Sequence, residues 1–413
     1  MRILSSGLAA RRVGKLASRG TRLENVEPTA RKIIAAVRRE GDRALRRFGE
    51  RWDGLQKGQS LRVDPAEIEA AWSAVTPELR RALRLAAGRI RSFALRQKPR
   101  EWRRSRDGIS LGQLVRPLDS VGCYVPGGRH PLVSTVLMTV IPAQVAGVKH
   151  IRVASPRPSV EVLAASALLG IKEFYRVGGA QAVAGLAYGT ESMVRVDKIV
   201  GPGNLYVTAA KKLVAFDCAI DFLAGPTELV IVADRGRPEF IAADLVAQAE
   251  HDPEALAVLV TTSRELARSV HTWVEKLARG NQLARQSLDR HGVILVAESR
   301  QVAFEWANRL APEHITIRRG EIPQVHNAGS VFVGDYSAQA AGDYASGPNH
   351  VLPTAGSARY RGGLSVMDFL KLITVQEVSL AGLRKIASIV ESLAETEGLG
   401  AHAASIRIRR GHA

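Results

Sequence analysis

The sequence predicts an α/β protein made of two incomplete, doubly wound, Rossmann-like parallel-sheet domains, with a helical N-terminal segment and a small C-terminal helical tail. Two observations support this prediction. From residue 120 onward, apolar strand-like runs alternate strictly with segments of helical periodicity, which is typical of parallel sheets covered by helices on both faces. The chain also has 413 residues, a length that suits two substantial domains better than one core.

The first hundred residues predict helices. Apolar side chains recur at helical spacing between residues 26 and 54, and Gly41 interrupts that pattern. Two more helices are expected over 65–75 and 77–97, because each stretch opens on a proline, which the first turn of a helix accepts.

The alternating region divides into two series of expected elements. Strands of the first series are expected at 120–126, 150–155, 173–179 and 197–203, with helices at 160–170, 180–189 and 204–215. Strands of the second series are expected at 228–234, 255–263 and 292–297, with short candidates at 314–317 and 330–334 and helices at 239–252 and 264–278.

These series suggest four parts of the chain. We expect an N-terminal segment at 1–20, a first α/β domain from 21–119 plus 233–365, a second α/β domain at 120–232, and a C-terminal helical tail at 366–413. The tail contains one apolar stripe at helical spacing and would be marginal alone, so it is expected to dock on a partner subunit or on the body.

Composition excludes several classes of protein. Hydrophobic residues make up 46% and charged residues 24%, as in ordinary globular proteins. Two cysteines exclude a disulfide framework and a four-cysteine zinc site, and no apolar run approaches the roughly 18 residues that span a bilayer. The net charge of +18 comes from arginines spread along the chain without interleaved aromatics, which favours a solvated surface over a nucleic-acid-binding face.

The N-terminal twenty residues are basic and lack an apolar core, so they are interpreted as part of the protein rather than a targeting peptide. An organelle presequence remains the alternative. The chain is expected to be cytoplasmic.

Three glycine-rich corners each follow an expected strand and precede a helix, at 124–129, 177–181 and 201–204. Open α/β sheets bind ligands at such corners, because helix N-termini present free N–H groups to anions. The dinucleotide fingerprint GxGxxG is absent, and tight turns need glycine in any case. Three corners at one edge of one sheet nevertheless predict a binding cleft.

Polar side chains at suggestive spacing are few. Gln248 and His251 stand three apart on an expected helix and so share a face, either as a metal-binding pair or as a surface hydrogen-bonding pair. Glu313 and His314 form a carboxylate–imidazole neighbour pair suited to acid–base chemistry, although adjacent side chains often point apart. Asp343 offers an anionic oxygen in a glycine-flanked loop.

The chain closely resembles the histidinol dehydrogenase family. The resemblance runs in family order across residues 25–410 and is carried by long, specific stretches: VGCYVPGGRHPLVSTVLMTVIPAQVAGV, RVGGAQAVAGLAYGT, DKIVGPGNLYVT, AGPTELVIVAD, ADLVAQAEHDP, APEHITI, GDYASGPNHVLPT, GGLSVMDFLKLITVQE and GLGAHAASIR.

The resemblance implies a role for each candidate residue. Gln248, His251, Asp343 and His402 match the ligands of one zinc ion per subunit, with His402 donated by the partner in a homodimer. Glu313 and His314 match the acid–base pair, and Tyr124, Gln181 and Asn204 match contacts to NAD. The zinc ligands and His314 also match substrate contacts, together with Thr227, where the family usually has serine, Glu397 from the partner and, less directly, His350.

The implied activity is the last step of histidine biosynthesis, the four-electron oxidation of L-histidinol to L-histidine through L-histidinal with two NAD⁺. His314 and Glu313 are expected to act as bases in turn, while the cofactor accepts hydride. One alternative is a related enzyme that oxidises another small alcohol, such as a sulfonated diol. Another is a nucleic-acid-binding protein on the same scaffold, which the set of site residues disfavours. No membrane partner is expected.

Overall fold

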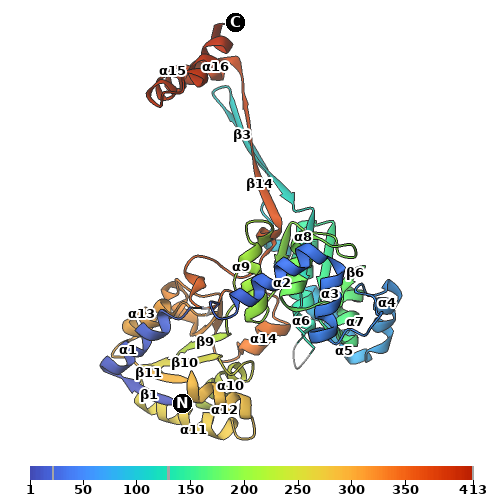
Figure 1. Cartoon of the computed structure of the whole chain (residues 1–413). Coiled ribbons are helices and arrows are strands. Elements are labelled where there is room, and N and C mark those ends of the chain that lie inside the picture. Colours follow the sequence, from blue (N-terminus) through green and yellow to red (C-terminus); the bar gives the residue numbers. More distant parts are fainter. Residues whose placement is uncertain (21–22, 128–130, 412–413) are drawn as a thin grey trace.

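Two parallel sheets organise the molecule, as the alternating pattern predicts (Figure 1). The computed structural model describes residues 1–20, 23–127 and 131–411. The six-stranded sheet has the parallel order β1 (Arg2–Ser5), β11 (Val293–Val296), β10 (Leu256–Thr261), β9 (Glu228–Val232), β12 (His314–Ile317) and β13 (Ser330–Val333). The five-stranded sheet has the parallel order β6 (Glu173–Tyr175), β5 (His150–Ala154), β4 (Ser120–Tyr124), β7 (Lys198–Val200) and β8 (Ala219–Ile220).

Helices cover both faces of the six-stranded sheet. On β9, Leu229 and Ile231 pack with α10 (Pro238–Ala249), α11 (Arg264–Leu277) and α12 (Gln282–Arg290). Val230 and Val232 pack on the opposite face with α1 (Ser6–Ala17) and α13 (Arg300–Leu310). Successive strand side chains point to opposite faces, so a strand buried on both sides reads as a continuous apolar run. This is why the segment ELVIV predicts a strand although its polar and apolar residues do not alternate.

The five-stranded sheet has its own layers of helices. One face carries α2 (Glu27–Glu40), α3 (Asp42–Phe48), α8 (Gly179–Tyr188) and α9 (Leu205–Val214), and the short η1 (Gly49–Asp53) follows α3. The other face carries α4 (Pro65–Ala74), α5 (Pro77–Gln97), α6 (Val133–Ala146) and α7 (Val160–Leu168). Both faces of each parallel sheet are therefore covered, and the expected fold class is confirmed.

The sheets divide the chain differently from the expected boundaries. The helices of 27–97 pack on the five-stranded sheet, so assigning 21–119 to the first α/β domain with 233–365 was wrong. The strand at 228–232 belongs to the six-stranded sheet rather than to a domain at 120–232, and the N-terminal segment supplies edge strand β1. An apolar stripe predicts that a helix is covered, but it does not say which sheet covers it.

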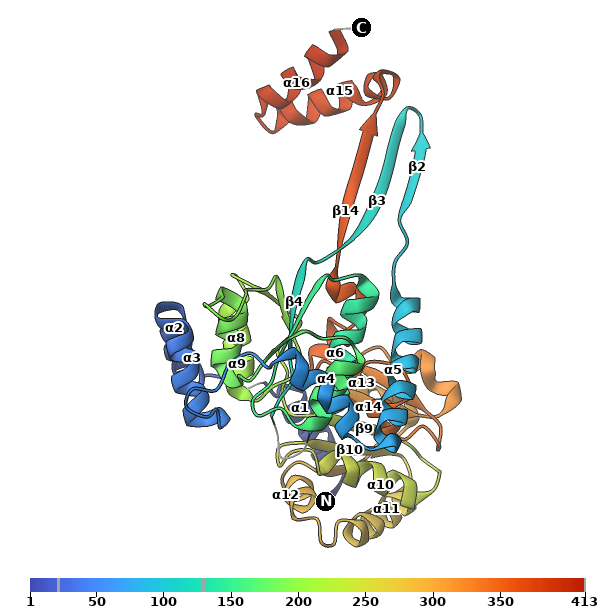
Figure 2. The ribbon, with the colours of Figure 1, turned by 90° about the vertical axis from the view of Figure 1, so that its right-hand side faces the viewer.

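A long antiparallel arm is the feature that the sequence did not predict. It consists of β2 (Trp102–Arg106), β3 (Ile109–Pro117) and β14 (Leu370–Val378). The arm projects away from both sheets and carries α15 (Leu380–Thr396) and α16 (Gly400–Gly411) at its tip (Figures 1 and 2). The tail at 366–413 is therefore only partly helical. The apolar stripe of α15 stays incompletely covered within one chain, since Leu393 is exposed.

The remaining elements are short: η2 (Arg319–Gln324), α14 (Gln339–Tyr344), η3 (Ser357–Arg359) and η4 (Val366–Phe369). Among the described residues, no helix combines the length and the apolar character needed to cross a membrane.

Asp244 on α10 makes stability depend on pH. Burial raises the pKa of this half-buried carboxyl group to about 6. The ionised form therefore destabilises the folded state above about pH 6, and the penalty disappears as the pH falls toward the unfolded value near 4. After allowance for solvent screening, Asp244→Asn is expected to raise the free energy of unfolding by about 1–2 kcal/mol at pH 8 and to leave it unchanged near pH 4.

Urea denaturation at the two pH values measures this difference. Asp289→Asn, at an exposed position on α12, is the matched control and should change stability little at either pH. An equal gain for Asp244→Asn at both pH values would show that the effect is not one of ionisation.

Candidate active site

Glu313 and His314 stand where the chain enters β12, at the amino edge of the six-stranded sheet. Helix α13 ends on Ala311 in the left-handed conformation, and Pro312 leads into the strand. Both residues are buried, with 7% of the surface of Glu313 and 3% of that of His314 exposed. Their charged atoms lie close together, 3.7 Å between His314 Nδ1 and Glu313 Oε2, so these neighbours do not point apart.

The geometry assigns the tautomer of His314. Its Nδ1 lies 3.1 Å from the carbonyl oxygen of Glu228, and a carbonyl can only accept, so Nδ1 carries the hydrogen. The free electron pair then sits on Nε2, which is 4.0 Å from Asp343 Oδ1. Burial lowers the pKa of His314 to about 4. The imidazole is therefore neutral near pH 7 and able to accept a proton at Nε2.

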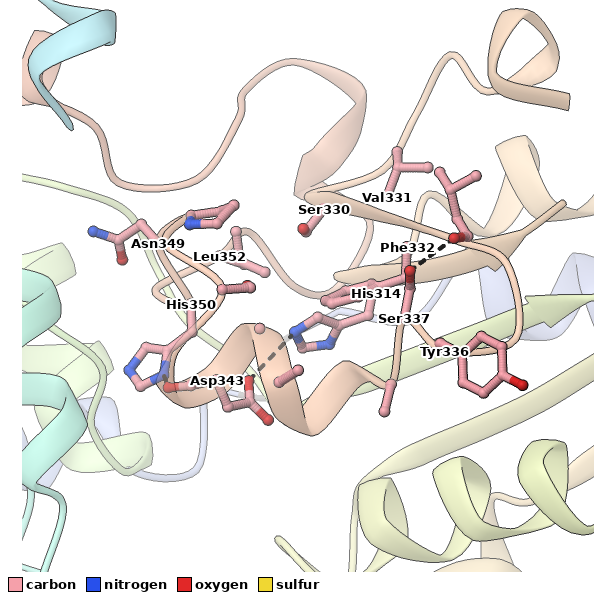
Figure 3. A pocket seen from close by; sticks show the side chains of 16 residues that line it. His314, Ser330, Val331, Phe332, Tyr336, Ser337, Asp343, Asn349, His350 and Leu352 are labelled. Carbon is pink, nitrogen blue, oxygen red and sulfur yellow. Dashed lines mark hydrogen bonds and ion pairs between the residues drawn. The ribbon is translucent and has the colours of Figure 1, made fainter. Parts of the chain in front are cut away.

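A cavity of about 420 Å³ opens beside this nitrogen. Its lining includes His314, Asp343, His350, Phe332 and Tyr336, and Figure 3 shows His314 and His350 on either side of Asp343. The volume is that of a site for a small molecule.

Glu313 is held by hydrogen bonds through one oxygen. Its Oε2 accepts from Thr227 Oγ1 at 2.5 Å and from the Glu228 N–H at 2.9 Å. Burial raises its pKa well above the usual range, and these hydrogen bonds oppose that rise. The same threonine hydroxyl accepts from Gln248 Nε2 at 2.7 Å. Thr227 therefore joins Gln248 to Glu313, and a serine in its place could make the same two contacts.

Those contacts fix the orientation of Gln248. Because Nε2 donates to Thr227, the amide oxygen Oε1 points elsewhere, and it is buried without a hydrogen-bond partner among the residues the structure describes. Buried carbonyl oxygens are rarely left unpaired. An oxygen prepared in this way suits a bound cation.

His251 and Asp343 complete the local set. His251 lies beyond the end of α10 at Ala249 rather than on the expected helix, and it influences the pKa of both His314 and Asp343. Asp343 lies on the short helix α14 rather than in the expected loop, and Gln339 Nε2 donates to its Oδ2 at 3.0 Å. In the described parts of the chain, no three His, Cys, Asp or Glu side chains gather as a metal group. A metal held here would therefore need ligands beyond these four residue types in one chain, such as the amide oxygen of Gln248.

His350 shares the loop that follows α14. Its Nδ1 lies 2.8 Å from the carbonyl oxygen of Asp343, and burial lowers its pKa to about 4. Next to it, Asn349 donates to the carbonyl oxygen of Met138 on α6. This loop therefore links the site to α6, which packs on the five-stranded sheet.

Glu397 and His402 are not brought to this cavity within one chain. Both are exposed at the tip of the arm, Glu397 at the end of α15 and His402 in the first turn of α16. Figures 1 and 2 show that tip well away from α14 and β9.

The three glycine-rich corners lie at the carboxyl ends of β4, β6 and β7. The chain leaves β4 toward β5 on one side and returns from β6 to β7 on the other, so the strand order reverses between β4 and β7. Ligands of doubly wound sheets bind at such a point. Residues 128 and 129 of the first corner fall outside the described residues.

Tyr124, Gln181 and Asn204 stabilise these corners. The hydroxyl of Tyr124 accepts from the Gly179 N–H at 3.0 Å, and Asn204 Oδ1 accepts from two N–H groups at the start of α9. Gln181 Nε2 donates to Asp53 Oδ2, which also accepts from the Gly178 N–H, both at 2.9 Å. Sequence reasoning missed Asp53, because an Asp-Gly pair after a helix reads as an ordinary turn.

The two cysteines lie outside this chemistry. Cys123 and Cys218 are both buried and unpaired, and burial raises the pKa of each thiol to about 12. A thiol in that state is a poor nucleophile.

Two doubly wound sheets and a buried carboxylate–imidazole pair beside a cavity define an α/β enzyme. Residues 16–410 match the family model described as histidinol dehydrogenase. The chain is 48% identical to the histidinol dehydrogenase of Methanothermobacter thermautotrophicus over 97% of both chains. It is 44% identical to that of Aquifex aeolicus over 97% of this chain and 96% of the relative. The crystal structure of histidinol dehydrogenase from Elizabethkingia anophelis superposes with a TM-score of 0.93 at 36% identity, covering 99% of this chain and 98% of the other.

The chain therefore belongs to the histidinol dehydrogenase family and is an oxidoreductase.

Proposed function

We propose that the protein oxidises L-histidinol to L-histidine through L-histidinal, with one zinc ion per subunit and two NAD⁺ used in succession. The observation that carries the proposal is a connected set of side chains: Gln248, Thr227, Glu313 and His314. It joins a buried amide oxygen, which has no partner in the described parts of the chain, to an acid–base pair. Family membership supports the choice of alcohol.

The residues fit a zinc ion. Gln248 Oε1, the His251 imidazole and the Asp343 carboxylate would hold it, with the partner subunit's His402 as the fourth ligand. Nitrogen and oxygen ligands of this kind suit zinc, although glutamine is an uncommon one. Bound zinc would supply a template for the nitrogen ligands of the substrate.

The residues also fit NAD. The corners at the ends of β4, β6 and β7 would bind it, with Tyr124, Gln181 and Asn204 as contacts, because helix N-termini favour the anionic pyrophosphate. Bound NAD⁺ would accept hydride.

The acid–base steps belong to His314 and Glu313. Nε2 of neutral His314 takes the hydroxyl proton as hydride leaves the substrate carbon, which yields the aldehyde. Glu313 then takes a proton from water as that water adds to the carbonyl. This addition leaves the anion of the hydrate, which loses a second hydride and one proton to give the carboxylate. Because burial raises the pKa of Glu313, its carboxylate is a stronger base toward water than that of an exposed glutamate.

A homodimer with crossed sites would complete the pocket. The partner subunit's Glu397 would favour the cationic amine of the substrate, and the partly covered stripe of α15 would pack in the interface. The projecting arm supports this assignment, since it carries both residues away from their own body.

NADH production by the purified protein, with zinc present and L-histidinol at alkaline pH, tests the reaction. We expect two NADH per histidinol and histidine as the product. No turnover by a folded, zinc-loaded protein would overturn the substrate assignment. Sulfonated diols and other amino alcohols are the comparison substrates.

His251→Asn tests the metal. The variant should lose zinc and activity together, because asparagine removes the imidazole ligand while remaining similar in size. Metal analysis of the dialysed protein gives a readout independent of turnover. His150→Asn, at an exposed position on β5, should keep both. Full zinc content in His251→Asn would refute the ligand assignment.

A further inference from the structure

Arg19, at the end of the N-terminal segment, donates hydrogen bonds through all three nitrogens of its guanidinium group. Nε and Nη2 donate to the two carboxylate oxygens of Glu228 at 2.6 and 2.5 Å. Nη2 also donates to the Leu310 carbonyl at 3.0 Å, and Nη1 donates to the Leu16 carbonyl at 2.7 Å. Only 17% of the arginine side chain and 4% of the glutamate side chain are exposed.

The backbone of Glu228 contacts both members of the acid–base pair. Its N–H donates to Glu313 Oε2, and its carbonyl oxygen accepts from His314 Nδ1. A third contact, from the Ala355 N–H to Glu228 Oε1 at 3.0 Å, fixes the side chain from another direction. The peptide groups that orient Glu313 and His314 thus belong to the residue that Arg19 holds.

Arg19 also binds the segment that leads into β12. Leu310 is the last residue of α13, three positions before Glu313. One planar guanidinium therefore joins the start of β9 to the turn that leads into β12. We propose that Arg19 and Glu228 are positioning residues, which set the register of these two strand starts and thereby the orientation of Glu313 and the tautomer of His314.

This inference rests on the proposed function and goes beyond it. A buried ion pair adds little net stability compared with apolar packing, so stability alone is a weak reason for placing one here. The rigid fork of arginine, by contrast, fixes distance and angle, which lysine cannot do.

The first test is Arg19→Gln in the full-length protein. We expect kcat for L-histidinol to fall roughly 10- to 100-fold, the scale of a small misplacement of catalytic groups, with KM and zinc content close to wild type. Arg19→Lys keeps the charge and is the variant to use if Arg19→Gln does not fold. Its kcat should lie between those of Arg19→Gln and the wild type. Millimolar methylguanidinium should partly restore the kcat of the Arg19→Ala variant.

Arg152 supplies the matched control. It forms a similarly buried pair with Glu173 on β5 and β6, at 2.9 Å, and that pair does not contact the acid–base residues. Arg152→Gln should lower stability without lowering kcat. An unchanged kcat in folded Arg19→Gln or Arg19→Lys, or an equal loss in Arg152→Gln, would overturn the inference.

Nitrogen NMR of the His314 ring separates this inference from the proposed function. The signals of the His314 ring nitrogens are identified as those that the His314→Asn variant lacks. The wild type should show hydrogen on Nδ1, and Arg19→Gln should show a smaller share of that tautomer. This readout holds even if the wild type does not oxidise histidinol. An unchanged tautomer in Arg19→Gln would overturn the inference, whichever substrate the enzyme uses.

Discussion

His314→Asn is expected to lower kcat for histidinol roughly 10³-fold, within the range that a positioned general base contributes. The asparagine amide can keep the hydrogen bond to the Glu228 carbonyl, but its other atoms cannot take a proton near pH 7. Zinc content should stay near wild type, because His314 is not among the proposed ligands. Steady-state NADH formation and metal analysis check both expectations.

The control for this variant is a histidine outside the cavity. His291, at the end of α12, lies beside Glu254, and its replacement by asparagine should leave kcat unchanged. If His314→Asn stayed within tenfold of wild type, another group would have to be the base. Glu313, 3.7 Å away, would be the first candidate.

Two inactive variants should restore each other's activity when their subunits are mixed. His402→Ala removes the proposed zinc ligand in the tail, and His314→Asn removes the proposed base in the body. A mixed dimer contains one site with an intact body and an intact partner tail, and one site with neither. Random mixing makes about half of the dimers mixed, so activity should recover to roughly a quarter of wild type.

The formation of mixed dimers must be demonstrated before this result can be interpreted. The two variants should be refolded or co-expressed together, and the mixed dimer isolated with two different affinity tags. A mixture of His314→Asn with Glu313→Gln is the control, because both changes lie in the body and no arrangement yields a complete crossed site for every step. Recovery of activity in this control mixture would refute the proposal of crossed sites. So would a lack of recovery when His314→Asn is mixed with His402→Ala.

Much of the fold follows from local pattern. The continuous apolar runs at β9 and β10 and the helical periods between the strands predicted both parallel sheets, because strand and helix periods depend only on neighbouring residues. The same local logic predicted the three glycine corners. It also predicted that Gln248 and His251 share one helix face, but α10 ends at Ala249 and His251 lies beyond it. It also predicted Glu313 and His314 as a pair, since they are adjacent in the chain.

The arm was missed for a local reason too. Its strands mix polar and apolar residues on two exposed faces, as in WRRSR of β2, so no buried face imposes an alternating pattern. Nothing in the first hundred residues indicated which sheet their helices would cover.

The chemistry of the candidate site depends on contacts between distant parts of the chain. Because Gln248 donates to Thr227, its amide oxygen has no hydrogen-bond partner among the described residues. The Glu228 carbonyl sets the tautomer of His314, and Arg19 reaches Glu228 across 209 positions. Residue types and periods specify which groups are present and which faces they occupy. The direction of an amide, the position of a proton and the partner of an arginine are set by packing between segments far apart in sequence, and no local pattern encodes them.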